Sequence, residues 1–247
     1  MRYFIEIAYN GTHYHGWQIQ PNAITIQEVL NKSISTILQE DVSAVGCGRT
    51  DTSVHASQFF AHFDLQKGIS NIDDFTYRLN KFLPHDIACY KTFAVEDDQH
   101  TRFDATSRTY KYFIHQTKNP FKQDKSFLFT FDLDIDKMNE AAALLSNYED
   151  FTSFAKLHGD NKTNICELFY ANWTKTEDGL VFEIKANRFL RNMVRSIVGT
   201  LLDVGLNKLT IKEFTDIIEL KNRSEAGVSV PGKGLFLTKI EYPYIND

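Results

Sequence analysis

The sequence predicts a mixed α+β protein, because stretches with the alternation of β-strands are interleaved with stretches that have helical spacing. Residues 3–8 alternate apolar and mixed side chains, and residues 59–63 alternate in the same way. Between them, Thr25 and Glu28 have the spacing of a helix-capping box, and apolar residues then recur at helical spacing as far as Leu38. We therefore expect a strand, a helix and a second strand in the first part of the chain.

The same patterns continue along the rest of the sequence. A helix is predicted at 72–83, and Pro84 ends it because the residue before a proline avoids the helical conformation. Strands are expected at 87–95, 107–115, 167–175 and 180–186, with another near the C-terminus, and helices at 136–145, 187–205 and 211–220. An acidic run at 96–98 leads to the expected boundary between two α+β domains, 1–104 and 105–247.

The composition is typical of a soluble globular protein, with 43% hydrophobic and 24% charged residues in a chain of 247. No apolar run approaches the roughly 18 residues of a membrane span, and Glu6 interrupts the N-terminal apolar run, so neither a membrane partner nor a signal peptide is expected. Cys47, Cys89 and Cys166 are odd in number and widely spaced. We therefore expect no disulfide framework, no metal site and a reducing cytoplasmic location.

The charge pattern bears on nucleic-acid binding in two opposite ways. A net charge of −5 opposes contact with phosphates, which usually comes from lysine and arginine. However, residues 101–125 contain six basic residues against two acids, and residues 187–196 contain three arginines and no acid. The pattern is compatible with a basic cleft on an otherwise acidic protein.

The stretch Gly46–Ala56 is the strongest candidate site. Two glycines allow a backbone that comes close to another group, and Arg49 and Asp51 follow immediately. A neighbouring arginine favours the ionised carboxylate. From spacing alone, two interpretations stay open: a solvated Arg-Asp pair on a surface turn, or an aspartate that projects into a cleft.

Two later segments also hold candidate residues. Tyr110 lies in the strand predicted at 107–115, where it is either a half-buried strand aromatic or a residue that contacts a ligand. In the helix predicted at 187–205, capped by Asn187, the spacing puts Arg188, Arg191 and Arg195 on one face. Three cations without acids repel one another, so this face is either solvated or opposite an anion.

The motif at Gly46–Ala56 closely resembles the active-site signature of the TruA family of tRNA pseudouridine synthases, except that the family usually has Ala-Gly at Thr52-Ser53. Further segments resemble blocks of that family in the same order: Gly16-Trp17-Gln18, Asp150–Phe154, Phe189–Gly199 and Pro231–Leu237. Together these blocks span nearly the whole chain.

The resemblance implies a fold of two similar ferredoxin-like (RRM-like) halves whose antiparallel sheets join, with the active-site cleft between them. It implies a homodimer that isomerises uridine to pseudouridine in the anticodon stem-loop of tRNA. The reaction imports no group and changes no oxidation state, so no cofactor is expected.

The resemblance also implies roles for individual residues. Asp51 is the catalytic carboxylate, which either attacks C1′ or removes the C2′ proton, and Arg49 and Arg195 hold its charge in place. Tyr110 stacks on the target uracil, and Arg49 also contacts the flipped nucleotide. The remaining substrate contacts are expected from Arg188, Arg191 and Lys156.

Two rival functions remain open on the sequence. The first is a paralogue that binds structured RNA without modifying it, which the net negative charge and Thr52-Ser53 support. The second is a hydrolase that uses Asp51 on small nucleosides. The hydrolase needs a second acid or a metal, and no carboxylate cluster has suitable spacing.

Overall fold

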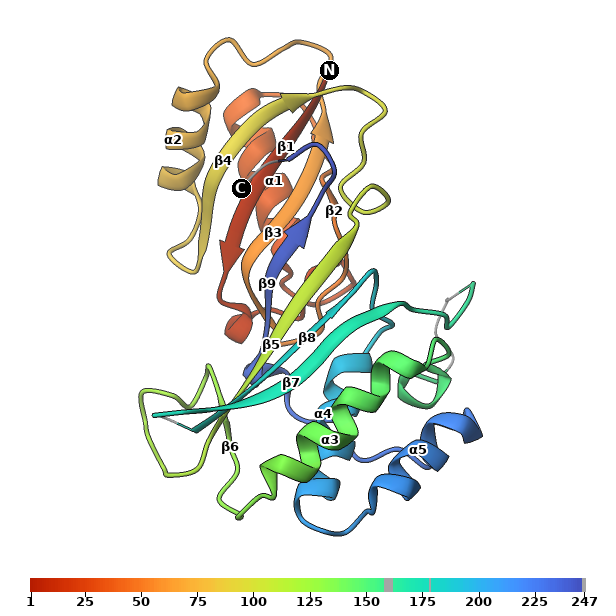
Figure 1. Ribbon diagram of the computed structural model, residues 1–247. Coiled ribbons are helices and arrows are strands. Elements are labelled where there is room, and N and C mark those ends of the chain that lie inside the picture. The colour runs from red at the N-terminus through yellow and green to blue at the C-terminus, as the bar shows by residue number, and fades with distance from the viewer. Residues whose placement is uncertain (158–161, 178, 246–247) are drawn as a thin grey trace. The chain divides into compact units, whose positions relative to one another are not determined.

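The computed structural model describes residues 1–157, 162–177 and 179–245. Within these residues the chain is a mixed α+β protein with five α-helices and mostly antiparallel strands (Figure 1). It divides into two compact units, of which the first contains Met1–Thr106 and the end of the chain from Leu237, and the second contains Ser107–Phe236. The expected boundary at 104/105 lies close to this division, but the C-terminal strand, expected in the second domain, groups with the first unit.

The first unit is built on four long strands. Its elements are β1 (Arg2–Tyr9), the 3-10 helix η1 (Gly11–His13), α1 (Ile26–Leu38), β2 (Val45–Gly46), β3 (His55–Asp64), α2 (Ile72–Phe82), β4 (Ile87–Val95) and most of β9 (Leu235–Glu241). The strand order is β4-β1-β3-β9, and β2 also pairs with β3. Because β1 pairs antiparallel with both β3 and β4, its side chains form the centre of the core, with Phe4, Ile5 and Ile7 fully buried.

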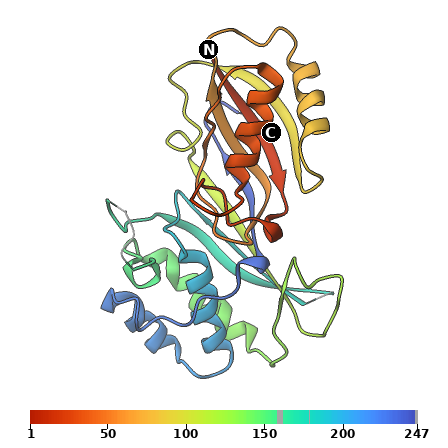
Figure 2. The same ribbon diagram turned by 180° about the vertical axis from the view of Figure 1, so that it is seen from behind.

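The helices of the first unit begin and end near the predicted positions. The Thr25 hydroxyl accepts a hydrogen bond from the Glu28 N–H (3.4 Å), as the predicted cap requires, and α1 buries Ile26, Leu30 and Ile34. Helix α2 ends at Phe82, just before Leu83 takes an extended conformation ahead of Pro84. Figure 2 shows α1 lying across one face of the sheet, so the helical stripe covers the apolar side of the strands.

The second unit packs three α-helices against a smaller sheet. Its elements are β5 (Ser107–His115), β6 (Phe127–Leu128), α3 (Ile135–Leu144), the 3-10 helices η2 (Leu145–Asn147) and η3 (Thr152–Phe154), β7 (Leu168–Thr176), β8 (Gly179–Ala186), α4 (Met193–Gly205), α5 (Ile211–Leu220) and η4 (Gly232–Gly234). Strands β5, β8 and β7 pair antiparallel in that order, whereas β6 pairs parallel with β5. The beginning of β9 completes the unit. There the rings of Phe236 and Phe113 pack edge-on, with their centroids 5.1 Å apart.

The long basic helix predicted from 187 was wrong in its starting point, because α4 begins at Met193. The predicted cap, Asn187, instead extends the hairpin: its N–H donates to the Glu167 carbonyl (2.9 Å), and its Oδ1 accepts from the Glu167 N–H (3.0 Å). Asn192 then takes a left-handed conformation (φ 68°) ahead of the helix. Residues 187–192 are therefore not helical, so Arg188 and Arg191 do not share a helix face with Arg195.

An asparagine side chain binds the backbone of the outermost strand in each unit. Asn80 of α2 donates to the Cys89 carbonyl (2.6 Å) and accepts from the Cys89 N–H (2.8 Å). Asn139 of α3 makes the same pair of bonds with Trp173 of β7 (3.1 and 2.6 Å). A carboxamide has the donor and acceptor of a peptide group, so it takes the place of a neighbouring strand on β4 and β7.

We expect Asn80→Ala and Asn139→Ala each to lower the free energy of unfolding by about 1–3 kcal/mol, because each leaves a backbone donor and acceptor without their partner. Denaturant titration measures the loss. Asn80→Asp keeps an acceptor for the Cys89 N–H but sets a carboxylate oxygen against the Cys89 carbonyl oxygen, so it should not recover the stability of wild type. An unchanged midpoint in both alanine variants would show that water replaces these bonds at no cost.

His62 is a buried titratable group near the C-terminal end of β3. Its Nδ1 lies 2.7 Å from the Thr101 hydroxyl, and its ring centroid lies 4.6 Å from that of His100. Burial, with the nearby charge of Arg2, lowers the pKa of His62 to about 4. The folded protein therefore keeps this imidazole neutral at a pH where the unfolded chain, with a pKa near 6.5, takes up a proton.

Stability should consequently fall as the pH drops from about 6.5 to about 4, because the unfolded state binds more protons in that window. We expect His62 to contribute on the order of 1–2 kcal/mol to this fall. The measurement compares urea unfolding of wild type and His62→Gln across the window. The variant should show the shallower pH dependence, and parallel curves for the two proteins would contradict the assignment.

Candidate active site

The loop between β2 and β3 carries Asp51, and its two ends are fixed by the sheet. Strand β2 pairs with the end of β3, and the Cys47 N–H then donates to the Phe60 carbonyl (2.8 Å). Between these points the chain turns tightly, since the Val54 N–H donates to the Asp51 carbonyl (3.2 Å). Asp51 therefore sits at the first position of a hydrogen-bonded turn that leads directly into β3.

The segment after β1 clamps this loop along its length. Trp17 N–H donates to the Thr50 carbonyl (3.2 Å), and Ser53 N–H donates to the Tyr14 carbonyl (3.2 Å). The Nδ1 of buried His55 accepts from the Gly11 N–H (3.1 Å). The segment 11–17 and the Asp51 loop, which are separate in the sequence, are therefore joined by three hydrogen bonds in the structure.

The two glycines of the clamping segment are required by close backbone contact. A β-carbon on Gly16, whose φ is +86°, would lie 2.3 Å from the Thr50 carbonyl oxygen. One on Gly11 would lie 2.0 Å from the Val54 carbonyl oxygen. Neither distance leaves room for a side chain, so only glycine lets the segment approach the Asp51 loop this closely.

Burial differs sharply between neighbouring residues of the loop. Thr50 is buried and its hydroxyl lies 2.8 Å from that of Tyr9, whereas Arg49 is exposed and Asp51 is half-buried. Arg49 and Asp51 belong to the same loop, and the pairing of their charges expected from their spacing stays a prediction.

Ser53 occupies the position where the resemblance leads us to expect glycine, and its backbone is left-handed (φ 61°). This conformation costs a residue with a β-carbon about 1–2 kcal/mol. The bond from its N–H to Tyr14 and the turn at Asp51 hold it there. The loop thus keeps the conformation that a glycine would adopt without strain, at some cost in stability.

In the second unit, the structure distinguishes between two tyrosines of β5. Tyr112 is fully buried, and its hydroxyl donates to the Pro231 carbonyl (2.9 Å). Tyr110 is half-buried, and its ring meets the ring of Phe189 edge-on, with centroids 5.1 Å apart and planes at 88°. Phe189 therefore orients the Tyr110 ring while part of that ring remains accessible.

Arg195 lies in the first turn of α4 and is tied to the segment before η4. Its Nε donates to the Val230 carbonyl (2.7 Å), and its own carbonyl accepts from the Val230 N–H (3.2 Å). These two bonds fix the base of the guanidinium group. The side chain is half-buried, which is compatible with the expected role in holding a charge.

The other three predicted cations take different positions. The Lys156 N–H donates to the Arg191 carbonyl (3.0 Å), so these two exposed residues, far apart in sequence, lie side by side. Arg188 is half-buried, and its guanidinium donates to the carbonyls of Thr163 and Ile165 (3.2 and 3.4 Å). Arg188 therefore helps to hold the chain between η3 and β7, a role that the sequence did not reveal.

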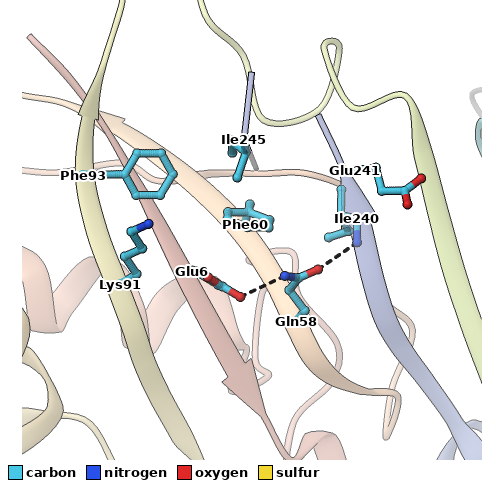
Figure 3. A pocket seen from close by; sticks show the side chains of 8 residues that line it. All are labelled: Glu6, Gln58, Phe60, Lys91, Phe93, Ile240, Glu241 and Ile245. Atoms are coloured by element: carbon cyan, nitrogen blue, oxygen red, sulfur yellow. Dashed lines mark hydrogen bonds between the residues drawn. The ribbon is translucent and has the colours of Figure 1, made fainter. Parts of the chain in front are cut away.

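A cavity of about 580 Å³ lies elsewhere in the first unit, on the sheet (Figure 3). It is lined by Glu6, Gln58, Phe60, Lys91, Phe93, Ile240, Glu241 and Ile245. The Gln58 carboxamide donates to Glu6 (2.9 Å) and accepts from the Ile240 N–H (2.9 Å), which links β1, β3 and β9. Since none of the residues predicted from the sequence lines this cavity, we do not assign it to the candidate site.

Sequence reasoning missed the residues that support the loop, chiefly Tyr9, Tyr14 and His55. His55 carried a signal because it belongs to the same motif as Asp51, and Tyr9 and Tyr14 belong to the stretch that contains the Gly16-Trp17-Gln18 block. Among the residues that the structure describes, no group of three or more His, Cys, Asp or Glu side chains is arranged to hold a metal ion. In the same ranges, no helix has the length and apolar character needed to cross a membrane.

The model of a protein family described as tRNA pseudouridine synthase matches residues 6–104 and 141–243. The chain belongs to the tRNA pseudouridine synthase family. Asp51, Arg49 and Arg195 lie inside the matched stretches, as do the three other predicted cations. Tyr110 lies in the intervening stretch, 105–140, which the family model leaves unmatched.

Individual members of the tRNA pseudouridine synthase family match the chain nearly end to end. A protein named tRNA pseudouridine synthase A from Bacteroides fragilis is 54% identical over 243 residues, covering 98% of this chain and 96% of its own length. Proteins of the same name from Parabacteroides distasonis and Bacillus subtilis are 50% identical over 242 residues and 37% identical over 246 residues. These alignments cover 98% of this chain and 96% and 99% of the relatives.

The left-handed backbone at Ser53 predicts how substitutions at this position change the free energy of unfolding. Ser53→Gly should raise the free energy of unfolding by up to about 1 kcal/mol, because the relief of strain exceeds the added freedom of the unfolded chain. Ser53→Val should lower it by about 1–2 kcal/mol, since a β-branched residue tolerates this conformation poorly. Denaturant unfolding of both variants measures the effect, and the reverse order of stabilities would contradict the strain at this position.

Proposed function

We propose that the chain is an isomerase that converts uridine to pseudouridine in the anticodon stem-loop of tRNA, with Asp51 as its catalytic carboxylate. The observation that carries the proposal is the Asp51 loop, whose backbone is held at both ends and clamped by residues 11–17. The relatives named tRNA pseudouridine synthase A support the same reaction, because they align with this chain over nearly its full length.

The chemistry needs a carboxylate at a fixed position. The C–N glycosidic bond breaks, the uracil turns, and a C–C bond forms to the same ribose carbon. The C5 proton leaves and N1 takes up a proton, so the composition of the nucleotide is unchanged. Asp51 assists either by attacking C1′ or by removing the C2′ proton, and both routes need its ionised form. A loop fixed by backbone bonds favours this role, because the carboxylate does not have to be ordered during the reaction.

The remaining site residues bind and orient the substrate in this proposal. Tyr110 stacks on the uracil, which allows the detached base to turn in its plane, and the edge-on contact with Phe189 supports the ring. Arg195 stabilises negative charge at the reaction centre. Arg49 contacts the flipped nucleotide, a role compatible with its exposed side chain.

Contacts to the tRNA backbone are assigned to the cations of the second unit. Lys156 and Arg191 lie side by side and are both exposed, so they form a local positive patch suited to phosphates. Arg188 contributes less directly, because it already donates to two backbone carbonyls. Such contacts recognise the shape and backbone of the RNA rather than its sequence.

We further propose that the two units are the two ferredoxin-like halves of the family fold, with the active-site cleft between them, in a cytoplasmic homodimer. In the first unit β1 lies between β4 and β3, and β2 also pairs with β3; this pairing, with helices α1 and α2 following β1 and β3, supports the interpretation for that half. In the second unit, the succession β5-α3-β7-β8-α4-β9 supports it in the same way. The homodimer, the cleft and the location rest on the family resemblance alone.

We expect Asp51→Asn to abolish pseudouridine formation while tRNA binding stays within about threefold of wild type, since the amide keeps the size of the side chain but is neither base nor nucleophile. The assay is tritium release from C5-labelled tRNA transcript, paired with filter binding of the same transcript.

Asp41→Asn is the matched control, because it makes the same chemical change at an exposed acid of the same unit. The control should retain wild-type turnover. Full activity in Asp51→Asn would remove Asp51 from its assigned role. Binding by the wild type without tritium release would favour an RNA-binding paralogue, and free uracil from uridine would indicate a hydrolase.

A further inference from the structure

The loop between β5 and β6, residues 116–126, exposes an aromatic ring almost completely. Phe121 is 92% exposed. Figure 1 shows this yellow-green β5–β6 loop projecting from the end of β5, on the opposite side of the second unit from α5, and Figure 2 shows the same arrangement from behind. A single exposed ring is common on protein surfaces, so its meaning depends on what surrounds it.

Hydrogen bonds within the β5–β6 loop hold its backbone in two successive turns. The Asn119 side chain accepts from the Phe121 N–H (2.9 Å), and the Asn119 carbonyl accepts from the Lys122 N–H (3.2 Å). A second turn follows, where the Lys125 N–H donates to the Lys122 carbonyl (3.1 Å). Pairing of β5 with β6 closes the base of the loop, so the exposed ring sits on a framework of hydrogen bonds.

The charged side chains of the β5–β6 loop are mainly cationic. Lys118, Lys122 and Lys125 lie in the β5–β6 loop against a single acid, Asp124. Lys118 and Lys125 are exposed and make no ion pair with any residue that the structure describes. A surface with three lysines, one acid and an accessible aromatic ring is suited to a polyanion that also offers flat rings.

The base of the β5–β6 loop also lies near positive charges. His115 is buried at the end of β5, where its Nδ1 lies 2.9 Å from the Ser126 hydroxyl. Burial lowers the pKa of His115, and the positive charges of Lys122 and Lys233 lower it further. Lys233 thus adds a further cation near the base of the loop.

We propose that the β5–β6 loop is a second tRNA-binding surface of this chain, with its three lysines at phosphates and Phe121 stacked on an unpaired base. This inference rests on the proposed function, because it adds a contact for the same substrate. The loop falls within 105–140, the stretch that the family model leaves unmatched. The loop contact is therefore additional to the candidate residues, such as Lys156 and Arg191, that lie inside the matched stretches.

The test measures the affinity for an unmodified tRNA transcript by filter binding over a series of salt concentrations. Phe121→Ala should raise Kd roughly tenfold with an unchanged salt dependence, because it removes stacking but no charge. The triple variant Lys118→Ala, Lys122→Ala, Lys125→Ala should raise Kd at low salt and reduce the slope of log Kd against log salt by about two to three. In the tritium-release assay, both losses should appear mainly in KM.

Matched controls come from exposed residues of the first unit. The triple variant Lys32→Ala, Lys67→Ala, Lys81→Ala makes the same change in net charge, and Tyr90→Ala removes a ring that is 61% exposed. Both controls should retain the wild-type Kd and salt slope. An equal loss in the lysine controls would show that only net charge matters, and would overturn the inference.

The outcomes separate this inference from the proposed function. A wild-type protein that forms pseudouridine, together with loop variants that bind tRNA with unchanged Kd and slope, would overturn the loop contact alone. If the wild type binds tRNA but releases no tritium, the proposed reaction fails while the binding series still decides the role of the loop. A wild type that does not bind tRNA would overturn both.

Discussion

The close contact between two segments, residues 11–17 and 50–55, is the constraint on which the candidate site depends. Three cross-bonds join the segments, and Gly11 and Gly16 approach carbonyl oxygens at distances that exclude any side chain. The backbone bonds of this contact fix the position of the Asp51 backbone, which a catalytic carboxylate at a defined place requires.

Strain in the same loop follows from this arrangement. Ser53 takes a left-handed backbone, and the turn at Asp51 and the bond from its N–H to the Tyr14 carbonyl hold it there. Residues in such conformations persist only where the surroundings determine them, and they occur often at functional sites. The departure from the family pattern at Ser53 therefore costs stability locally and does not by itself remove the loop geometry on which catalysis would depend.

Local placement of cations reconciles the acidic composition with an RNA substrate. The chain carries a net charge of −5, yet Lys156 and Arg191 are brought side by side by a backbone bond, and the β5–β6 loop gathers three lysines around Phe121. Phosphate contacts depend on the charges within about a Debye length, roughly 10 Å, rather than on the charge of the whole protein. Acids placed elsewhere on the chain then oppose binding only weakly at physiological salt.

The sequence by itself determined the mixed α+β class, the family, the strand that carries Tyr110 and the loop that carries Asp51. These features rest on local patterns: the period of the apolar residues, the cap at Thr25, the stop at Pro84 and an ordered set of motifs. An element predicted from a local pattern forms as predicted when no interaction with distant residues competes with it. This is why the ends of α1 and α2 lie close to their predicted positions.

Only the tertiary structure decided the features that depend on bonds between distant residues. Helix α4 begins at Met193 rather than near Asn187, because the backbone and side chain of Asn187 bond to Glu167 in the hairpin. The clamp on the Asp51 loop and the bonds of Asn139 to Trp173 of β7 also join residues far apart in the chain. The periodicity of apolar residues indicates which face of an element is buried, but not which distant donor or acceptor a polar group will bond. Those long-range hydrogen bonds determine the geometry of the site.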